Sequence, residues 1–468
     1  MPHQKIRVEQ DSLGQIEVPV GALYGAQTAR ALLNFQISGR TAHPSLIRAY
    51  LAIKDAAARA NLCAGTLEPE QARMISHAVE VILAKSEREW TEIFPVDPYQ
   101  AGAGTSQNMN INEVIANVAN LREHGAESAL GRYEPIHPND HVNRSQSTND
   151  TYPTAIRLAL LDLAPELCAE LRQLAVAFGE KASQWRAIPK AARTHLNDAV
   201  PMRLGQEFGA YAWTIEKCAE RIDSSLEELR ELGIGGSAAG TALTVPQDYL
   251  ATIVPELARA SGQKLRRAPD LCEAMQSQAP LMEYSSMLRV MALELTRICN
   301  DLRLLASGPL TGLGEITLPA VQPGSSIMPG KINPSILEMV NQVCFSVLGY
   351  DHTTAMAMQA GQLELNVMMP VMAFSILEAT TIATRAVRTL RERCISGMSA
   401  NATRLAHYFE ATPQMATALS ARLGYERTAE LVQRALHEGS TVVALVRREK
   451  LISDAELEEL LEPVRRIG

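Results

Sequence analysis

Apolar residues recur every three or four positions along several long stretches of this sequence. Within residues 153–185 they share one helical face, made of Ile156, Leu160, Leu163, Leu167, Leu171, Leu174 and Phe178. A helix of about 30 residues is about 45 Å long. Further long helices are predicted over residues 204–232, 281–306, the stretch after Pro334, and 362–393, where Pro370 can introduce a kink. Five such helices indicate an elongated helical bundle and a mainly α fold.

Segments rich in proline and glycine divide the chain. Residues 135–140 separate an N-terminal part from the long helices, and residues 311–334 form an extended loop between two of them. A loop of this length inside a helical protein is usually functional. Past residue 400 the predicted helices are short and charged. We therefore expect three domains: an N-terminal domain at 1–143, a central helical bundle at 144–399, and a small C-terminal helical domain at 400–468.

Composition narrows the class of protein. The chain has 468 residues and a net charge of −8, which argues against a general nucleic-acid-binding protein. It contains neither an uncharged apolar run long enough to cross a membrane nor an apolar secretory segment at its start. Its seven cysteines are scattered without a Cys-x-x-Cys pair, as expected of reduced thiols. These features predict a cytoplasmic protein with no nucleic-acid or membrane partner.

Four polar segments interrupt the apolar pattern, at residues 102–110, 141–150, 193–198 and 324–334. They are rich in Ser, Thr and Asn, and three of them are expected to lie at the start of a long helix. Free backbone N–H groups at a helix N-terminus favour anions. Each segment alone could be an ordinary capped helix start. Four together, with Lys331 in the last, predict a pocket for a small ligand that carries carboxylates.

The last segment, Gly-Ser-Ser-Ile-Met-Pro-Gly-Lys-Ile-Asn-Pro at 324–334, resembles the signature loop of the aspartase/fumarase superfamily. The other three segments resemble that family's remaining characteristic regions, in the same order. Within the superfamily, Thr105-Ser106 and Ser147-Thr148-Asn149-Asp150 resemble the aspartase forms more than the fumarase forms. The resemblance covers nearly the whole chain.

The resemblance implies a three-domain, mainly α subunit that assembles as a homotetramer. Each active site would draw its segments from three subunits. The implied reaction is reversible anti-elimination of ammonia from L-aspartate to give fumarate, without a cofactor. Long helices with apolar faces that one chain cannot cover agree with such an assembly.

That reaction requires removal of a weakly acidic C–H next to a carboxylate, so it needs a base and donors placed where charge develops. We expect Ser325 to act as the base, helped by backbone N–H groups of its loop and by Lys331. Ser326 can add a donor. Lys331 and Asn333 should bind the carboxylate that accepts the charge.

The remaining candidate residues follow from the resemblance as substrate-binding groups. Thr105, Ser106, Ser147 and Thr148 should hold the same carboxylate region, whereas Thr194 and His195 should hold the other carboxylate. Asn149 should contact the amino group or a carboxylate. Arg30 matches an arginine proposed to aid carboxylate binding. Glu338 could pair with His195 or be an ordinary acid in the first turn of a helix. No metal site is expected, because no His or acidic cluster has ligand spacing.

Three departures from the family pattern keep other activities open. Met369 stands where aspartases have Glu and fumarases Lys, Asn197 replaces a Gln, and the Asn-Pro common in the C-terminal domain is missing near residues 421–425. The alternatives are a class II fumarate hydratase, or an ammonia-lyase for another amino acid or a betaine. A more remote alternative is a non-catalytic structural protein on a lyase fold, as in lens storage proteins.

Overall fold

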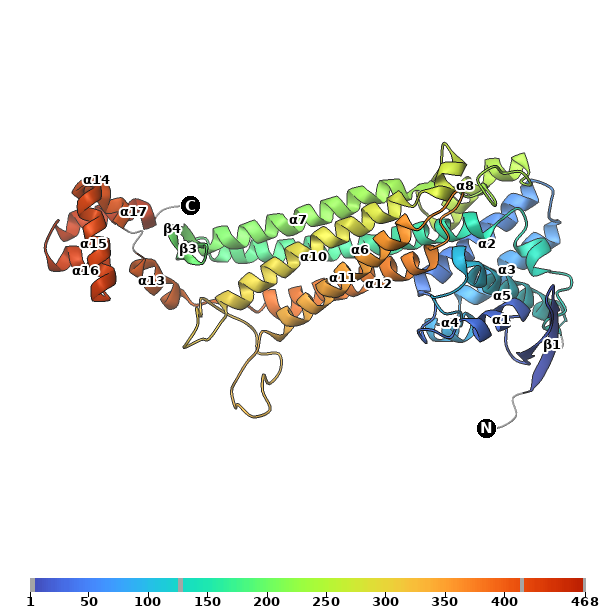
Figure 1. Ribbon diagram of the computed structural model, residues 1–468, viewed down its shortest axis with the longest axis horizontal. Coiled ribbons are helices and arrows are strands. Elements are labelled where there is room, and N and C mark those ends of the chain that lie inside the picture. Colours follow the sequence, from blue (N-terminus) through green and yellow to red (C-terminus); the bar gives the residue numbers. More distant parts are fainter. Residues whose placement is uncertain (1–4, 125–128, 413–415, 466–468) are drawn as a thin grey trace. The chain divides into compact units, whose positions relative to one another are not determined.

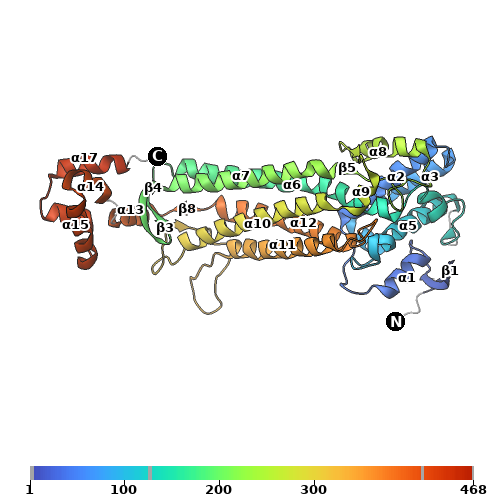
Figure 2. The same ribbon diagram turned by 45° about the horizontal axis from the view of Figure 1, so that its top comes forward.

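The computed structural model describes residues 5–124, 129–412 and 416–465. The chain divides into two compact units. Unit 1 comprises Met1–Cys168, Glu220–Val290 and Ser346–Ala383, and unit 2 comprises Ala169–Ala219, Met291–Phe345 and Thr384–Gly468. Within each unit, segments of the same five long helices lie side by side (Figures 1 and 2). The expected mainly α fold is confirmed.

The long helices agree closely with the hydrophobic pattern. They are α6 (Thr148–Gln184), α7 (Leu204–Leu229), α10 (Ala279–Leu305), α11 (Ser335–Gln359) and α12 (Met369–Leu390). Residues such as Leu160, Leu167 and Leu171 are fully buried, as the periodicity of α6 predicts.

The fifth helix was predicted to begin too early. Residues 361–368 form an irregular turn, and α12 begins only at Met369, so Pro370 lies in its first turn rather than at a kink. The Asn366 side chain holds this turn. Its Nδ2 donates to the carbonyls of Ala357 and Met358, and its Oδ1 accepts from the Met368 N–H. Proline fits the first turn of a helix because no intrahelical partner awaits an N–H there.

Unit 1 adds shorter helices and two small sheets to its share of the long helices. The helix α2 (Pro44–Cys63) packs against α3 (Pro69–Leu83), α5 (Thr105–His124) and α8 (Gln247–Ser261). The other elements are α1 (Ala26–Asn34), α4 (Glu87–Ile93), α9 (Leu271–Gln276), the antiparallel pair β1 (Ile6–Asp11) and β2 (Gly14–Pro19), and the parallel pair β5 (Glu231–Leu232) and β6 (Arg266–Arg267).

Unit 2 contains a hairpin that the hydrophobic pattern does not predict. Strands β3 (Pro189–Thr194) and β4 (Asn197–Arg203) pair antiparallel, and α7 follows directly. The two turn residues, His195 and Leu196, have φ of 56° and 60°. Positive φ at both positions is typical of the type I′ turn that suits the twist of a hairpin. The third polar segment therefore lies at a hairpin tip and not at a helix start.

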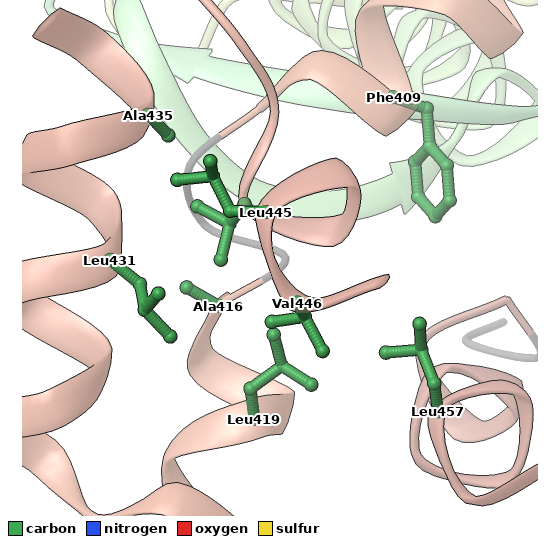
Figure 3. Packing of buried hydrophobic residues seen from close by; sticks show 9 residues of the cluster. Phe409, Ala416, Leu419, Leu431, Ala435, Leu445, Val446 and Leu457 are labelled. Atoms are coloured by element: carbon green, nitrogen blue, oxygen red, sulfur yellow. The ribbon is translucent and has the colours of Figure 1, made fainter. Parts of the chain in front are cut away.

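The rest of unit 2 comprises a short strand pair and the C-terminal helices. Strand β7 (Ile316–Thr317) pairs antiparallel with β8 (Ser399–Ala400). The helices are α13 (Ala402–Ala411), α14 (Ala416–Leu423), α15 (Tyr425–Glu438), α16 (Val442–Arg448) and α17 (Asp454–Arg465). They share a small apolar core, with Leu419, Leu445 and Leu457 fully buried (Figure 3).

Among the residues that the structure describes, no helix is long and apolar enough to cross a membrane. All seven cysteines are free thiols, and five of them are buried.

Candidate functional site

In unit 1, a tight glycine turn places Thr105 and Ser106 at the first two positions of α5. Ala103 and Gly104 have φ of 60° and 83°, and the Ala103 N–H donates to the Val367 carbonyl over 2.8 Å. A Cβ at Gly104 would overlap the ring of Tyr152, which lies on α6. Glycine is therefore required at 104 for both its conformation and its close approach to α6.

The second polar segment forms the N-terminus of α6. The buried carboxylate of Asp150 accepts from the N–H groups of Ser147 at 3.0 Å, Gly235 at 3.1 Å and Ser237 at 3.0 Å. Burial raises the pKa of Asp150 to about 6, although these three backbone donors oppose the rise. Asp150 thus fixes the backbone that carries Ser147, Thr148 and Asn149 to the glycine-rich turn near residue 236.

Direct hydrogen bonds bring the first two polar segments together. Asn108 on α5 donates from Nδ2 to Thr148 Oγ1 over 3.2 Å. Asn149 Nδ2 donates to the Ala238 carbonyl over 2.8 Å, which leaves Asn149 Oδ1 as the accepting end of the amide. Two helix N-termini with hydroxyl and amide side chains therefore lie side by side, an arrangement that favours a carboxylate ligand.

In unit 2, Thr194 and His195 lie at the exposed tip of the β3–β4 hairpin. Asn197, which replaces the expected Gln, donates from Nδ2 to the His195 carbonyl over 3.2 Å. A non-glycine residue with positive φ is uncommon, costs about 1–3 kcal/mol, and persists only where the surrounding structure holds it. The turn therefore fixes the direction in which the imidazole leaves the backbone.

The signature loop joins α10 to α11 and runs away from the helices in Figure 1. Ser325 Oγ accepts from the N–H groups of Ile327 at 3.2 Å and Met328 at 3.1 Å. These are the backbone donors expected from the sequence, and they stabilise negative charge on the Ser325 oxygen. Ser326 and the Lys331 side chain are exposed.

The root of the loop is closed by Asn333. Its Nδ2 donates to the Gly324 carbonyl over 2.6 Å, and the Gly324 N–H donates to the Lys331 carbonyl over 2.8 Å. A Cβ at Gly324 would lie 2.8 Å from the backbone nitrogen of Asn333, so glycine is needed there. The Asn333 side chain thus holds the loop that presents Ser325 and Lys331.

Arg30 and Glu338 have protein partners in this structure. Arg30 makes a bidentate pair with Asp11, with Nε–Oδ2 at 2.7 Å and Nη2–Oδ1 at 2.9 Å, and this pair connects α1 to the β1–β2 hairpin. Glu338 lies in the first turn of α11, with Oε1 4.0 Å from Arg303 Nη2. Glu338 therefore has the position of an ordinary acid in the first turn of a helix, one of the two roles expected for it. Substrate binding by Arg30 and pairing of Glu338 with His195 stay predictions.

Glu315 is an anchoring residue that the sequence reasoning missed. Its carboxylate is fully buried in unit 2 and forms ion pairs with Arg193 Nη2 at 2.6 Å and Lys190 Nζ at 3.4 Å, both on β3. Lys190 also pairs with Glu207 over 2.6 Å. The only sequence signal was its position near the start of the 311–334 loop. Glu315 connects the hairpin that carries His195 to the start of the loop that carries Ser325.

The candidate residues are thus divided between the two units. Thr105, Ser106, Ser147, Thr148 and Asn149 belong to unit 1, as does Arg30. Thr194, His195, Ser325, Ser326, Lys331, Asn333 and Glu338 belong to unit 2. In the part of the chain that the structure describes, no group of three or more His, Cys, Asp or Glu side chains could hold a metal ion.

Two family descriptions match most of the chain. Residues 14–349 match the family described as lyase, and residues 415–465 match the fumarase C C-terminal family. The chain belongs to the aspartase/fumarase superfamily. Its predicted membership is therefore confirmed.

Individual relatives within this superfamily cover the chain almost completely. An aspartate ammonia-lyase from a Bacillus species is 43% identical over 98% of this chain and 97% of the relative. A class II fumarate hydratase from Corynebacterium glutamicum is 42% identical over 99% of this chain and 96% of the relative. A fumarate lyase:delta crystallin from Brucella melitensis, solved bound to cobalt, superimposes with a TM-score of 0.94 at 44% identity, covering 99% of this chain and all of that one.

The close approach of α5 to α6 can be tested with Gly104→Ala. The added methyl group would meet the Tyr152 ring at a residue with positive φ, so the free energy of unfolding should fall by roughly 1–3 kcal/mol or more. Activity should fall with it, because Thr105 and Thr148 would separate. Denaturant unfolding and steady-state kinetics measure the two effects.

The matched control is Gly179→Ala in the interior of α6, where a Cβ would have open space. There the better helix propensity of alanine should leave stability unchanged or raised by up to about 1 kcal/mol. Equal behaviour of the two variants would contradict the packing requirement at Gly104.

Proposed function

We propose that this protein is an aspartate ammonia-lyase that converts L-aspartate reversibly to fumarate and ammonia. Aspartate ammonia-lyases from several bacteria, among them the Bacillus enzyme, align with nearly the whole chain and support this activity. The single structural observation that carries it is the Ser325 oxygen, which receives two backbone N–H groups at the start of a glycine-proline loop.

In this mechanism the Ser325 alkoxide removes the proton next to the substrate carboxylate that becomes the aci-form. Ionisation of a serine hydroxyl is unfavourable, and the two N–H donors at Ser325 Oγ lower its cost. Lys331 stabilises the dianionic aci-carboxylate, assisted by Ser326 and Asn333. Ammonia then leaves from the neighbouring carbon, and the substrate's own carboxylate serves as the electron sink, so no cofactor takes part.

The other candidate residues bind the substrate. Thr105, Ser106, Ser147 and Thr148 hold the aci-carboxylate region, while Thr194 and His195 hold the second carboxylate. Asn149 contacts the amino group, since its Nδ2 is occupied by the Ala238 carbonyl and its Oδ1 remains as an acceptor for an ammonium donor. This orientation supports the amino group, rather than a carboxylate, as the ligand of Asn149.

The proposed assembly is a homotetramer in which each site draws its segments from three subunits. Large apolar side chains of unit 2 support such contacts. Trp213 on α7, Leu293 on α10 and Phe345 on α11 are 68%, 53% and 58% exposed. Exposed apolar groups of this size along long helices favour association with another surface. We propose the cytoplasm as its location, where the free cysteines would stay reduced.

Fumarate hydratase is the second candidate activity, because a class II fumarate hydratase is almost as similar as the aspartate ammonia-lyases. A different amine substrate is the third. Its support is Met369, which is fully buried at the start of α12 and brings no charge to the segment that contacts the Gly102–Gly104 turn. The three-domain division also remains a proposal.

The substrate test compares L-aspartate with L-malate. Ultraviolet absorbance of fumarate reports both reactions, and kcat/KM for aspartate should exceed that for malate by about 10⁴, the range of a site built to hydrogen-bond one polar group. The reverse reaction should require ammonia. Faster dehydration of malate would make the protein a fumarase, and no turnover of either would indicate another amine substrate.

Ser325→Ala should lower kcat by roughly 10²- to 10⁴-fold, the usual contribution of a general base. The helical circular dichroism spectrum and the number of chains in the assembly should stay unchanged, because the loop contributes little to the core. Ser224→Ala removes an exposed serine hydroxyl from α7 and serves as the control. Activity of Ser325→Ala within about threefold of the wild type would exclude Ser325 as the base.

Light scattering should give about four times 51.0 kDa, the mass of one chain. If Thr148 and Ser325 of one site come from different subunits, as proposed, coexpression of the Thr148→Ala and Ser325→Ala variants should restore part of the activity that each lacks in mixed tetramers. A fully active particle of one chain would contradict the assembly, and mixed tetramers without activity would contradict the shared site.

A further inference from the structure

A lysine buried inside unit 1 lies directly behind the proposed carboxylate-binding segments. Lys54 is in the middle of α2 and is 0% exposed. Its Nζ donates to Asn108 Oδ1 at 2.9 Å, Asn143 Oδ1 at 3.1 Å and Gln146 Oε1 at 2.9 Å. An ammonium group has three N–H donors, so three neutral amide oxygens satisfy it completely.

These contacts fix the direction of the surrounding amides. With Oδ1 of Asn108 held by Lys54, its Nδ2 points away and donates to Thr148 Oγ1 at 3.2 Å and to Asn143 Oδ1 at 3.2 Å. The Thr148 oxygen therefore accepts a hydrogen bond from the protein, and its own O–H remains for another acceptor. Gln146 is fixed in the same way, since its Nε2 donates to the carbonyls of Val142 and Arg144.

The environment of Lys54 also leaves its positive charge without a carboxylate in contact. The ionised group that acts on it through space is Asp150, whose oxygens accept from three backbone N–H groups instead. A buried charge is weakly screened, so protonated Lys54 contributes a positive potential around the N-termini of α5 and α6, which the Asp150 carboxylate partly offsets when it is ionised. A carboxylate bound there would be attracted by a cation that it never touches.

We propose that Lys54 is a positioning residue for substrate binding, which orients Asn108, Asn143 and Gln146 so that Thr148 presents its hydroxyl to a carboxylate in a positive potential. This role rests on the proposed function, because it concerns the same substrate carboxylate. It adds a group to the site that lies in the protein interior and that none of the four polar segments contains.

The charge of Lys54 makes the role measurable. Burial lowers the pKa of the Lys54 ammonium to about 7, although Asp150 opposes the shift. The groups that face Lys54 are the Asp150 carboxyl, with a pKa of about 6, the Tyr50 ring 6.0 Å away on α2, and uncharged amides from α5 and residues 143–146. Lys54 is protonated below pH 7 and becomes neutral as the pH rises through about 7, so carboxylate binding should weaken over that interval.

The experiment measures binding of succinate, a non-reacting dicarboxylate, by calorimetry on either side of pH 7. Lys54→Met keeps the length of the side chain and removes the charge and the donors. We expect the wild type to lose affinity as the pH rises through about 7. Lys54→Met should bind about tenfold or more weakly below pH 7, a loss of about 1.4 kcal/mol or more, and should lack the step. Lys181→Met is the control, because Lys181 donates to the carbonyls of Ser396 and Met398 and should affect neither quantity.

Asn108→Asp provides a second test if Lys54→Met does not fold. The new carboxylate would pair with Lys54 and neutralise its charge, and it could not donate to Thr148. The same loss of affinity below pH 7 is expected. Wild-type affinity in either folded variant, or an unchanged pH step in Lys54→Met, would overturn the role of Lys54.

These outcomes are separable from a failure of the proposed function. A wild type that binds succinate with the pH step but leaves aspartate unchanged would retain Lys54 and reject the ammonia-lyase. If the wild type converts aspartate but Lys54→Met binds succinate as the wild type does, the ammonia-lyase activity is retained and the role of Lys54 is rejected.

Discussion

The buried carboxylate of Glu315 is the contact that the functional part of unit 2 depends on. A carboxylate removed from water must be met by cations or N–H donors, and loss of one partner of such a pair costs about 3–5 kcal/mol. Glu315 meets Arg193 and Lys190, while its backbone N–H donates to the Leu305 carbonyl and its carbonyl accepts from Asn401. One residue thereby connects the end of α10, the β3–β4 hairpin and the start of the C-terminal helices.

The C-terminal helices share this anchorage. The Arg193 guanidinium lies 5.5 Å from the centre of the Tyr408 ring on α13, and Arg404 of the same helix donates to the carbonyls of Gly312 and Leu313. These contacts join α13 to the side chain that binds Glu315 and to the backbone just before it. The departures in the C-terminal domain therefore lie beyond a well-anchored first helix.

Unit 1 follows the same rule with different groups. Glu113 is almost fully buried and accepts from the N–H groups of Gly25, Gln27 and Thr28, which fixes the start of α1. Burial raises the pKa of Glu113, and the Thr28 hydroxyl and the three N–H groups oppose the rise. Lys54 and Asp150 are also buried, and their hydrogen bonds hold the N-terminal parts of α5 and α6 in place. The hydroxyls proposed to bind substrate are thus positioned by charges that they do not touch.

The sequence predicted those parts of the protein that depend on local pattern. Helical periodicity predicts α6, α7, α10 and α11 within a few residues. The residues of the proposed mechanism are taken from the four polar segments, and their roles stay predictions. The hairpin was missed because its turn, His195-Leu196, contains neither glycine nor asparagine to indicate positive φ. Lys54 and Glu315 were missed because their partners are remote. Lys54 lies among alanines and isoleucine in α2, and its acceptors follow 54 to 92 positions later.

Most of the side chains proposed to bind the substrate are uncharged hydroxyls and amides, and this affects catalysis. A site lined by several cations would bind the substrate dicarboxylate strongly before any charge develops, and such uniform binding does not raise kcat. In our proposal the hydroxyls of Thr105 and Thr148 and the amide of Asn333 bind the ground state more weakly, but fixed dipoles respond to the extra charge of the aci-form without reorganisation. The buried ion pairs and amide contacts hold these hydroxyl and amide groups in place. In our proposal Lys331 lies on the loop beside the base and meets the carboxylate only where that additional charge appears.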